Sequence, residues 1–164
     1  MIDQNQFRKY LIQAPLNEVG IYSRDAEELL IATAAQESVL GTYLHQESGP
    51  ACGIYQMEPN THDSLWNHFL ITTHNTGQEI TTLGYHILKT CNYTLRPDAS
   101  FMTHNLWYAS LMARVFYMDI EDPLPHHDDY ESIWTYYKTY WNTKFGKATR
   151  AEFFANLKKC GIVP

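Results

Sequence analysis

The sequence has little positive charge and no basic cluster. Its 164 residues include 12 Lys and Arg against 18 Asp and Glu, which gives a formal net charge of −6. Basic residues never form a block longer than two, as at Lys158-Lys159. Because proteins that bind nucleic acid need clustered Lys and Arg to neutralise phosphates, nucleic acid is not expected as a partner.

Long apolar stretches are also missing. The N-terminal segment, MIDQNQFRKYLIQAPL, carries charge early and contains no unbroken apolar run. No signal peptide is therefore recognised, and neither a membrane anchor nor a membrane partner is expected. If the target lies outside the cytoplasm, a holin-type pore, cell lysis or packaging into a virus particle has to deliver the protein.

Cysteine is scarce, and the histidines lack the spacing of a metal motif. Cys52, Cys91 and Cys160 are odd in number and have no CxxC spacing, so neither a disulfide framework nor a zinc knuckle is expected. None of the eight histidines lies in an HExxH motif, and the densest cluster is HHDD at 126–129, on an expected solvated loop. We therefore predict no metal site and no cofactor. A serine or cysteine nucleophile also lacks the glycine-flanked elbow that it would need.

The composition is that of one folded domain. Apolar residues make up 45% and charged residues 18% of the chain. At this length roughly 70% of the unfolded surface is buried on folding, so we expect a single domain over residues 1–164 with one core. The unusual feature is the aromatic content of 12 Tyr, 7 Phe and 4 Trp, which suits flat polar ligands such as sugars as well as a core.

Apolar residues mostly three or four apart predict a mainly α-helical fold. Ser23 is expected to cap a helix that runs to about Glu37, with acidic residues in its first turn. Thr149 and Glu152 form a capping box for the last helix, which Gly161 ends. The other predicted helices are a short one around Phe7, Tyr10 and Leu11 that Pro15 breaks, and the segments 61–72, 78–91, 101–119 and 129–141.

The helical pattern fails between residues 41 and 59. Glycines and prolines at positions 41, 49, 50, 53 and 59 interrupt it. The segment EDPLPHHDD at 121–129 is expected to be a surface connection. The predicted fold class is therefore a mainly α single domain, with a short irregular or β-like insertion after the helix that ends at Glu37.

Glu37 is the strongest candidate for a catalytic residue. It lies seven residues after Leu30 and three after Ala34, so helical spacing places it on the face that enters the core. Burial disfavours the ionised form and raises the pKa of a carboxyl group, which can then protonate a glycosidic oxygen near neutral pH. Spacing alone does not distinguish such an acid from a glutamate that ends a helix at the surface or pairs with an arginine.

The residues after Glu37 carry a more specific signal. Glu37-Ser38 is followed by SGPACGIYQMEPNT at 48–61. This arrangement resembles the signature of goose-type lysozymes and lysozyme-like lytic transglycosylases, in which a Glu-Ser pair ends a helix and S-x-x-G-A-x-G-L-x-Q-x-x-P follows about ten residues later. The matching residues are Ser48, Ala51, Gly53, Ile54 in place of leucine, Gln56 and Pro59, whereas Pro50 replaces the first glycine. The resemblance covers residues 37–61 and implies a lysozyme-like fold.

The downstream sequence also resembles this family, through less specific patterns. NLWYASLMARVFYM at 105–118 is similar to the family's amphipathic helix. YYKTYWNTKFG at 136–146 is similar to its Tyr-Asn motif, although Tyr140 and Asn142 are one residue further apart, through Trp141. The layout is also similar to that of small phage-encoded transglycosylase-like proteins.

One stripe of the helix predicted at 129–141 is expected in the core, whereas Tyr136 and Tyr140 lie off this stripe and are candidates for a sugar groove. The stripe comprises Tyr130, Ile133, Trp134, Tyr137 and Trp141.

The resemblance implies an enzyme that cuts the β-1,4 bond between N-acetylmuramic acid and N-acetylglucosamine in the glycan strands of bacterial peptidoglycan. In lytic transglycosylases one glutamate, here Glu37, protonates the bond and then takes the proton of the muramic acid C6 hydroxyl, which closes a 1,6-anhydro ring. Glu47, Glu58 and Asp63 are nearby carboxylates, but none has a motif behind it.

The same resemblance assigns substrate-binding roles to five other residues. Tyr55 and Gln56 would hold the sugar by stacking and hydrogen bonding, and Ser38 would stabilise the turn or the catalytic carboxylate. Tyr140 and Asn142 would line the groove from the other side. We expect Tyr55 and Gln56 to converge with Tyr140 and Asn142 in one cleft around the glutamate.

Two alternatives remain open at this stage. A hydrolytic lysozyme of the same fold would use water in place of the C6 hydroxyl, and a virion structural protein or wall-binding module would keep the fold without turnover. Because no signal peptide is recognised, we expect a phage protein. It would be either carried in the virion, with other tail proteins as possible partners, or released to the host cell wall by a separate pore.

Overall fold

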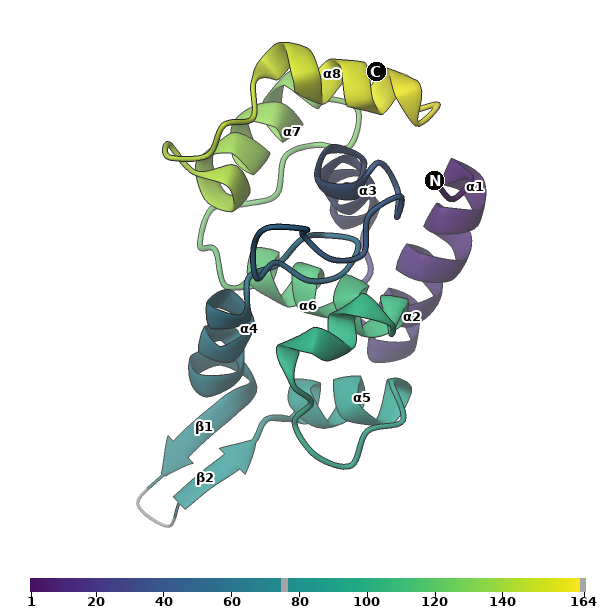
Figure 1. Ribbon diagram of the computed structural model, residues 1–164. Coiled ribbons are helices and arrows are strands. Elements are labelled where there is room, and N and C mark those ends of the chain that lie inside the picture. The colour runs from purple at the N-terminus through teal and green to yellow at the C-terminus, as the bar shows by residue number, and fades with distance from the viewer. Residues whose placement is uncertain (75–76, 163–164) are drawn as a thin grey trace.

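The computed structural model describes residues 1–74 and 77–162, which form a mostly helical fold with one small sheet (Figure 1). This agrees with the predicted class. The α-helices are α1 Gln4–Gln6, α2 Ala14–Val19, α3 Arg24–Ser38, α4 Pro59–Leu65, α5 Thr82–Thr90, α6 Leu106–Met118, α7 Tyr130–Tyr136 and α8 Arg150–Lys159. The tighter or wider helical segments are η1 Phe7–Gln13, η2 Trp66–Leu70, η3 Ala99–Thr103 and η4 Tyr137–Asn142, and the strands are β1 Ile71–His74 and β2 Gly77–Ile80.

Helix α3 lies at the centre of the fold. Its residues 29–35 are buried on every side, as expected of a helix enclosed by others, and it contacts η1, α6 and α8. The buried apolar residues form one cluster that extends from Phe7 to Ile162. Ser23 caps the helix as predicted, because its Oγ accepts a hydrogen bond from the Ala26 N–H at 3.1 Å.

A buried ion cluster ties the start of α3 to the N-terminal segment. The Arg8 guanidinium lies 3.2 Å from the Glu27 carboxylate and 2.7 Å from that of Glu28. The hydroxyl of Tyr22 donates to Glu27 at 2.7 Å, and that of Tyr130 donates to Glu28 at 2.5 Å. The two glutamates, which were expected only to face the positive end of the helix dipole, are thus also satisfied by a cation and by hydroxyl groups.

The first helical segment is longer than predicted. Elements α1, η1 and α2 follow one another without a break from Gln4 to Val19, and Pro15 lies inside α2. Proline lacks an N–H and crowds the carbonyl four residues earlier in a regular α-helix. Here the segment just before it, η1, is a wider helix with i→i+5 pairing, which accommodates the ring. The predicted break at Pro15 is therefore wrong.

Residues 71–74 and 77–80 form a β-hairpin where the sequence analysis extended two helices. Strand β1 pairs with β2 in antiparallel register, with Ile71 opposite Ile80. The three β-branched residues at 71–73 favour a strand over a helix, and this signal was overlooked. The hairpin extends away from the helices at the end of the molecule opposite α8 (Figure 1).

The remaining helices lie close to their predicted positions. Helix α6 begins at Leu106, after the short turn η3, and α7 with η4 continues from Tyr130 to Asn142. The capping box of Thr149 and Glu152 is present at the start of α8. Within residues 1–74 and 77–162, no helix combines the length and the apolar character needed to cross a membrane.

The connection from residue 39 to residue 58 has no regular helix or strand among its residues, all of which are described, as predicted. It is held instead by two isolated bridges, from His45 to Cys52 and from Cys52 to Met57. This connection and the segment after η4 form the walls of the candidate site.

Candidate functional site

A sharp turn follows the helix that carries Glu37. Val39, Leu40 and Gly41 all have positive φ values of 50°, 48° and 78°, which non-glycine residues seldom adopt. The Ser38 hydroxyl holds this turn, because its Oγ donates to the Ile54 carbonyl at 2.6 Å and accepts from the Gly41 N–H at 2.9 Å. Backbone strain of this kind is maintained only where the surroundings fix it, and here it joins the helix end to the loop opposite.

Glu37 is a partly buried carboxyl group with one strong hydrogen-bond partner. Burial raises its pKa from 4.5 to about 7, whereas the hydrogen bond donated by the Tyr137 hydroxyl to Oε1, at 2.6 Å, acts in the opposite direction. The same burial, together with the carboxylate, raises the pKa of Tyr137 well above its usual value, so this hydroxyl stays a donor. Glu37 can therefore hold a proton near neutral pH and also release it.

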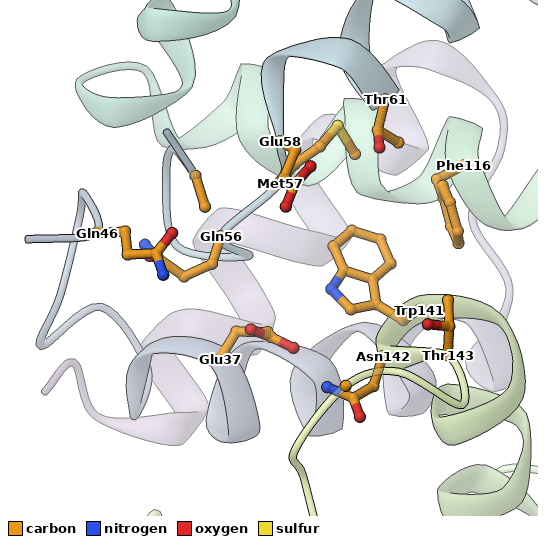
Figure 2. Close-up of a pocket in the computed structure, with 12 residues that line it drawn as sticks. Glu37, Gln46, Gln56, Met57, Glu58, Thr61, Phe116, Trp141, Asn142 and Thr143 are labelled. Carbon is orange, nitrogen blue, oxygen red and sulfur yellow. The ribbon is translucent and has the colours of Figure 1, made fainter. Parts of the chain in front are cut away.

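The carboxyl group faces a cavity of about 700 Å³ (Figure 2). Glu37 lies on one wall, Glu58 and Thr61 lie across from it, and Trp141 with Asn142 comes from the segment at the end of η4. The complete lining comprises Glu37, Gln46, Ala51, Gln56, Met57, Glu58, Thr61, Phe116, Trp141, Asn142, Thr143 and Gly146. Such a mixture of amide, carboxyl and aromatic groups suits a polar ligand with flat faces, such as a sugar.

Glu37 also borders a second cavity of about 470 Å³. This cavity is lined by residues of α3, η4 and α8, and it shares both Glu37 and Asn142 with the first. A third hollow of about 290 Å³ shares Thr61 and Phe116 with the first cavity. The first cavity thus adjoins the second on one side and the third on another, so the carboxyl group lies along a groove and not at the end of a blind pocket.

Gln56 is fixed in the cavity wall by its backbone. Its φ is 48°, and its side-chain Nε2 donates to the Gly53 carbonyl at 2.7 Å, which leaves the amide oxygen to face a ligand. Gly53 has to be glycine, because a Cβ there would lie 2.6 Å from the Met102 carbonyl oxygen and its φ is +74°. The structure thus explains why the sequence signature has glycine at position 53 and how Gln56 is held in the cavity wall.

Asn142 is held on the opposite wall by a lysine. The Lys138 ammonium donates to the Asn142 side-chain oxygen at 2.6 Å and to the Gly146 carbonyl at 2.8 Å. A Cβ on Gly146 would come within 2.3 Å of the Asn142 side chain, so the loop can fold back only with glycine there. The Asn142 side chain also hydrogen-bonds to the Tyr137 hydroxyl, so it lines the cavity directly beside the Tyr137–Glu37 pair.

An aromatic wall stands beside these amides. Trp141 lines the cavity, and its ring centroid lies 4.7 Å from that of Phe116 and 5.3 Å from that of Tyr117. Tyr55 packs behind it at 6.4 Å. The exposed face of Trp141 can stack on a sugar ring while the other rings hold it in place.

Two of the four residues predicted for the cleft join it and two do not, and Ser38 takes one of the two roles expected of it, stabilisation of the turn. Gln56 and Asn142 line the cavity with Glu37. Tyr55 is 1% exposed and its hydroxyl contacts Ser110, so it is a core residue that cannot stack on a ligand. Ser38 is fully buried and braces the turn, without touching the Glu37 carboxylate.

Tyr140 also lies outside the cavity, and the mapping of the Tyr-Asn motif onto it is wrong. Its hydroxyl donates to the Asp122 carboxylate. Tyr136, the other candidate off the stripe, is buried with its hydroxyl on the Asp122 carbonyl. The physical reason is η4, whose i→i+5 pairing turns the residues after Tyr137 away from the register of a regular α-helix.

The helical stripe placed Tyr137 and Trp141 in the core, and their position at the site was not predicted. Both are packed as expected, yet the hydroxyl of the first reaches Glu37 and the ring of the second lines the cavity. Trp141 lies between the two residues of the distorted Tyr-Asn motif, and this insertion was the one sequence signal for its role at the site. Tyr137 had no signal of its own.

No protein-family model, no curated protein and no solved structure matches the chain. The functional assignment therefore depends on the geometry of the groove and on the sequence signature.

Proposed function

We propose that the protein cleaves the glycan strands of bacterial peptidoglycan as a lytic transglycosylase of lysozyme-like fold, with Glu37 as its catalytic acid and base. The observation that carries this proposal is the partly buried Glu37 carboxyl group, whose pKa burial raises to about 7 and which lines two adjoining cavities of a polar groove. A pKa near the working pH suits a group that must both give and accept a proton in one turnover.

The first step uses Glu37 as an acid. Its proton passes to the oxygen of the β-1,4 bond between N-acetylmuramic acid and N-acetylglucosamine, and the C1–O bond breaks. The departing sugar leaves with a hydroxyl group, and positive charge develops at C1 of the muramic acid. The substrate's own acetamido oxygen can support this charge, so a protein nucleophile is not needed.

The second step uses the same residue as a base. The Glu37 carboxylate takes the proton of the muramic acid C6 hydroxyl while the C6 oxygen bonds to C1. This step closes the 1,6-anhydro ring and restores the protonated acid. The Tyr137 hydroxyl stabilises the carboxylate between the steps, since it already donates to Oε1 at 2.6 Å. Proton balance is complete, and no cofactor is required.

Gln56, Asn142 and Trp141 are the residues that we expect to position the sugar. The side-chain amides of the first two line the cavity and are held in place by hydrogen bonds within the protein, and the ring of the third offers a flat apolar face. Holding a flexible glycan in a reactive geometry provides a large part of the rate acceleration in such a reaction.

A hydrolytic lysozyme is the second candidate function, and Glu58 is the observation that favours it. This residue lines the same cavity across from Glu37, so it could activate a water molecule in place of the C6 hydroxyl (Figure 2). The Glu58→Gln variant separates the two mechanisms, because it should leave a transglycosylase largely active and disable a hydrolase.

Digestion of purified cell walls tests the proposal, with zymography for activity and mass spectrometry for products. A transglycosylase releases 1,6-anhydro muropeptides, each lighter by one water than the hydrolytic product. If only hydrated products form, the lysozyme candidate replaces the proposal. If walls remain intact, a virion structural protein or wall-binding module becomes the better account.

For delivery, we propose a phage protein that acts from the virion tail or that reaches the host cell wall through a separate pore. Mass spectrometry of purified particles distinguishes these routes, because only a virion protein is found with the tail proteins. Its absence from particles leaves the role in host lysis.

A further inference from the structure

A cluster of imidazole and carboxylate groups lies at the start of α3, away from the groove. Asp25 is in the first turn of the helix, and His126 and His127 belong to the connection between α6 and α7. One oxygen or nitrogen atom from each of the three lies within 4.8 Å of the others. These histidines were expected on a solvated loop. His126 is exposed as expected, whereas His127 is partly buried and bonds to Asp25, which lies 102 residues earlier.

His127 is held in one orientation by carboxylates on both sides. Its Nδ1 lies 2.7 Å from Asp25 Oδ1, which also accepts from the His127 backbone N–H at 2.8 Å. Its Nε2 lies 3.4 Å from the Asp128 carboxylate. The ring of His126 packs on that of His127 with centroids 4.1 Å apart. A histidine whose second nitrogen faces a carboxylate is the usual arrangement of a metal ligand.

We propose that Asp25, His126 and His127 bind one divalent transition-metal ion of the zinc class. Two imidazoles with a carboxylate suit zinc, nickel or copper, whereas magnesium and calcium prefer oxygen ligands alone. The ion takes the place of the proton shared by His127 Nδ1 and Asp25, which leaves to solvent, and the two atoms move apart from 2.7 Å to roughly 3.2 Å. The Nε2–H group of His127 then donates a hydrogen bond to Asp128, whose carboxylate stays ionised and supplies the second negative charge.

The position of the ion indicates a structural clasp rather than a reaction centre. Asp25 and Glu37 are twelve residues apart on one helix, or about 18 Å at 1.5 Å per residue, so the ion does not touch the groove. It would fasten the start of α7 to the start of α3. Since η4 directly follows α7 and carries Tyr137 and Asn142, the clasp would hold the two walls of the groove together from behind.

Calorimetric titration of metal-stripped protein with zinc chloride near pH 7.5 tests this inference. We expect saturable binding of one ion in the micromolar range, with proton release, and a rise in melting temperature of about 5 °C or more at saturation. Cobalt chloride should produce the visible absorption bands of a low-symmetry cobalt site with imidazole ligands.

The variants His127→Asn and His126→Ala should weaken zinc binding at least tenfold. Asparagine is chosen because its amide can still donate to Asp25 in place of Nδ1, so the fold is kept while the ligand is lost. His86→Ala is the matched control, since this exposed histidine on α5 lies outside the cluster, and it should bind zinc as the wild type does. No binding to wild-type protein, or equal binding in folded variants of the cluster, would overturn the inference. Neither result depends on wall-cleaving activity.

Discussion

Helix α3 carries buried carboxyl groups at both ends, and their surroundings are opposite. At its start, Glu27 and Glu28 share the Arg8 guanidinium, and although burial disfavours the cation, hydrogen bonds and charge attraction from these glutamates raise the pKa of Arg8. At its end, Glu37 receives one neutral hydroxyl, and burial raises its pKa to about 7. A carboxyl group that is buried with a cation therefore stabilises the fold in its ionised form, whereas one buried without a cation keeps a proton that is available for chemistry.

Removal of the Arg8 cation should have the largest effect on the stability of the protein. In Arg8→Met two buried carboxylates lose their counter-charge, so we expect a loss of about 3 kcal/mol or more in the free energy of unfolding. Chemical denaturation measures this loss. Lys9→Met, at an exposed position next to it, should change stability by less than about 0.5 kcal/mol. Similar effects in both variants would mean that the cluster is not a stabilising ion pair.

Removal of the titrating proton of Glu37, at the C-terminal end of α3, should lower the activity. Glu37→Gln keeps the shape and the hydrogen bond from Tyr137, so we expect cleavage of cell walls to fall by about two orders of magnitude or more. The control is Glu47→Gln, on the loop but outside the cavity lining. Retention of more than a tenth of the wild-type rate would remove Glu37 from the mechanism.

The same variant should be more stable than the wild type at alkaline pH. Because the pKa of Glu37 rises from 4.5 to about 7 on folding, its favourable contribution is complete below pH 4.5 and is lost as pH passes 7. Glutamine does not titrate. We expect Glu37→Gln to exceed the wild type by about 2 kcal/mol at pH 8.5 and by little at pH 4, as judged by urea unfolding at both values. A difference independent of pH would show that the carboxyl group is not desolvated.

Tyr137→Phe should have the smallest effect, a further rise in the pKa of Glu37. The hydroxyl stabilises the ionised form of Glu37, so its removal raises the pKa of Glu37 further and moves the alkaline limb of the pH–activity profile upward by about one unit or less. Tyr136→Phe, one residue earlier and bonded to the Asp122 carbonyl, is the matched control and should leave that limb unchanged. A downward shift would contradict the assigned role of the hydroxyl.

Local patterns in the sequence were sufficient to predict the part of the site that is formed by α3 and the connection after it. The helix cap at Ser23, the helix end at Glu37 and the irregular connection after it were predicted because caps, apolar spacing and glycine positions act over a few residues. Gln56 was found through the resemblance to the family signature, and Gly53, another position of that signature, is required by the conformation of the same loop.

The other wall of the groove could not be derived from local spacing. The wide turn η4 changes the register after Tyr137, so Trp141 and not Tyr140 reaches the cavity. The bond from Tyr137 to Glu37, like the contact of Asp25 with His127, joins residues about a hundred positions apart, and single-sequence periodicity holds no information on such pairs. The hairpin at 71–80 was missed for a simpler reason, because its β-branched residues were read as part of two helices.

These long sequence separations also set the order in which the protein can become functional during synthesis. Helix α3 can form early, but the hydroxyl that meets Glu37 comes 100 residues later, and α8, which packs on α3, later still. Contacts of this kind close large loops and form slowly. A nascent chain that ends before residue 137 therefore has the acidic residue without the second wall of its groove, and the proposed cleavage activity requires that the helices from α7 onward have docked.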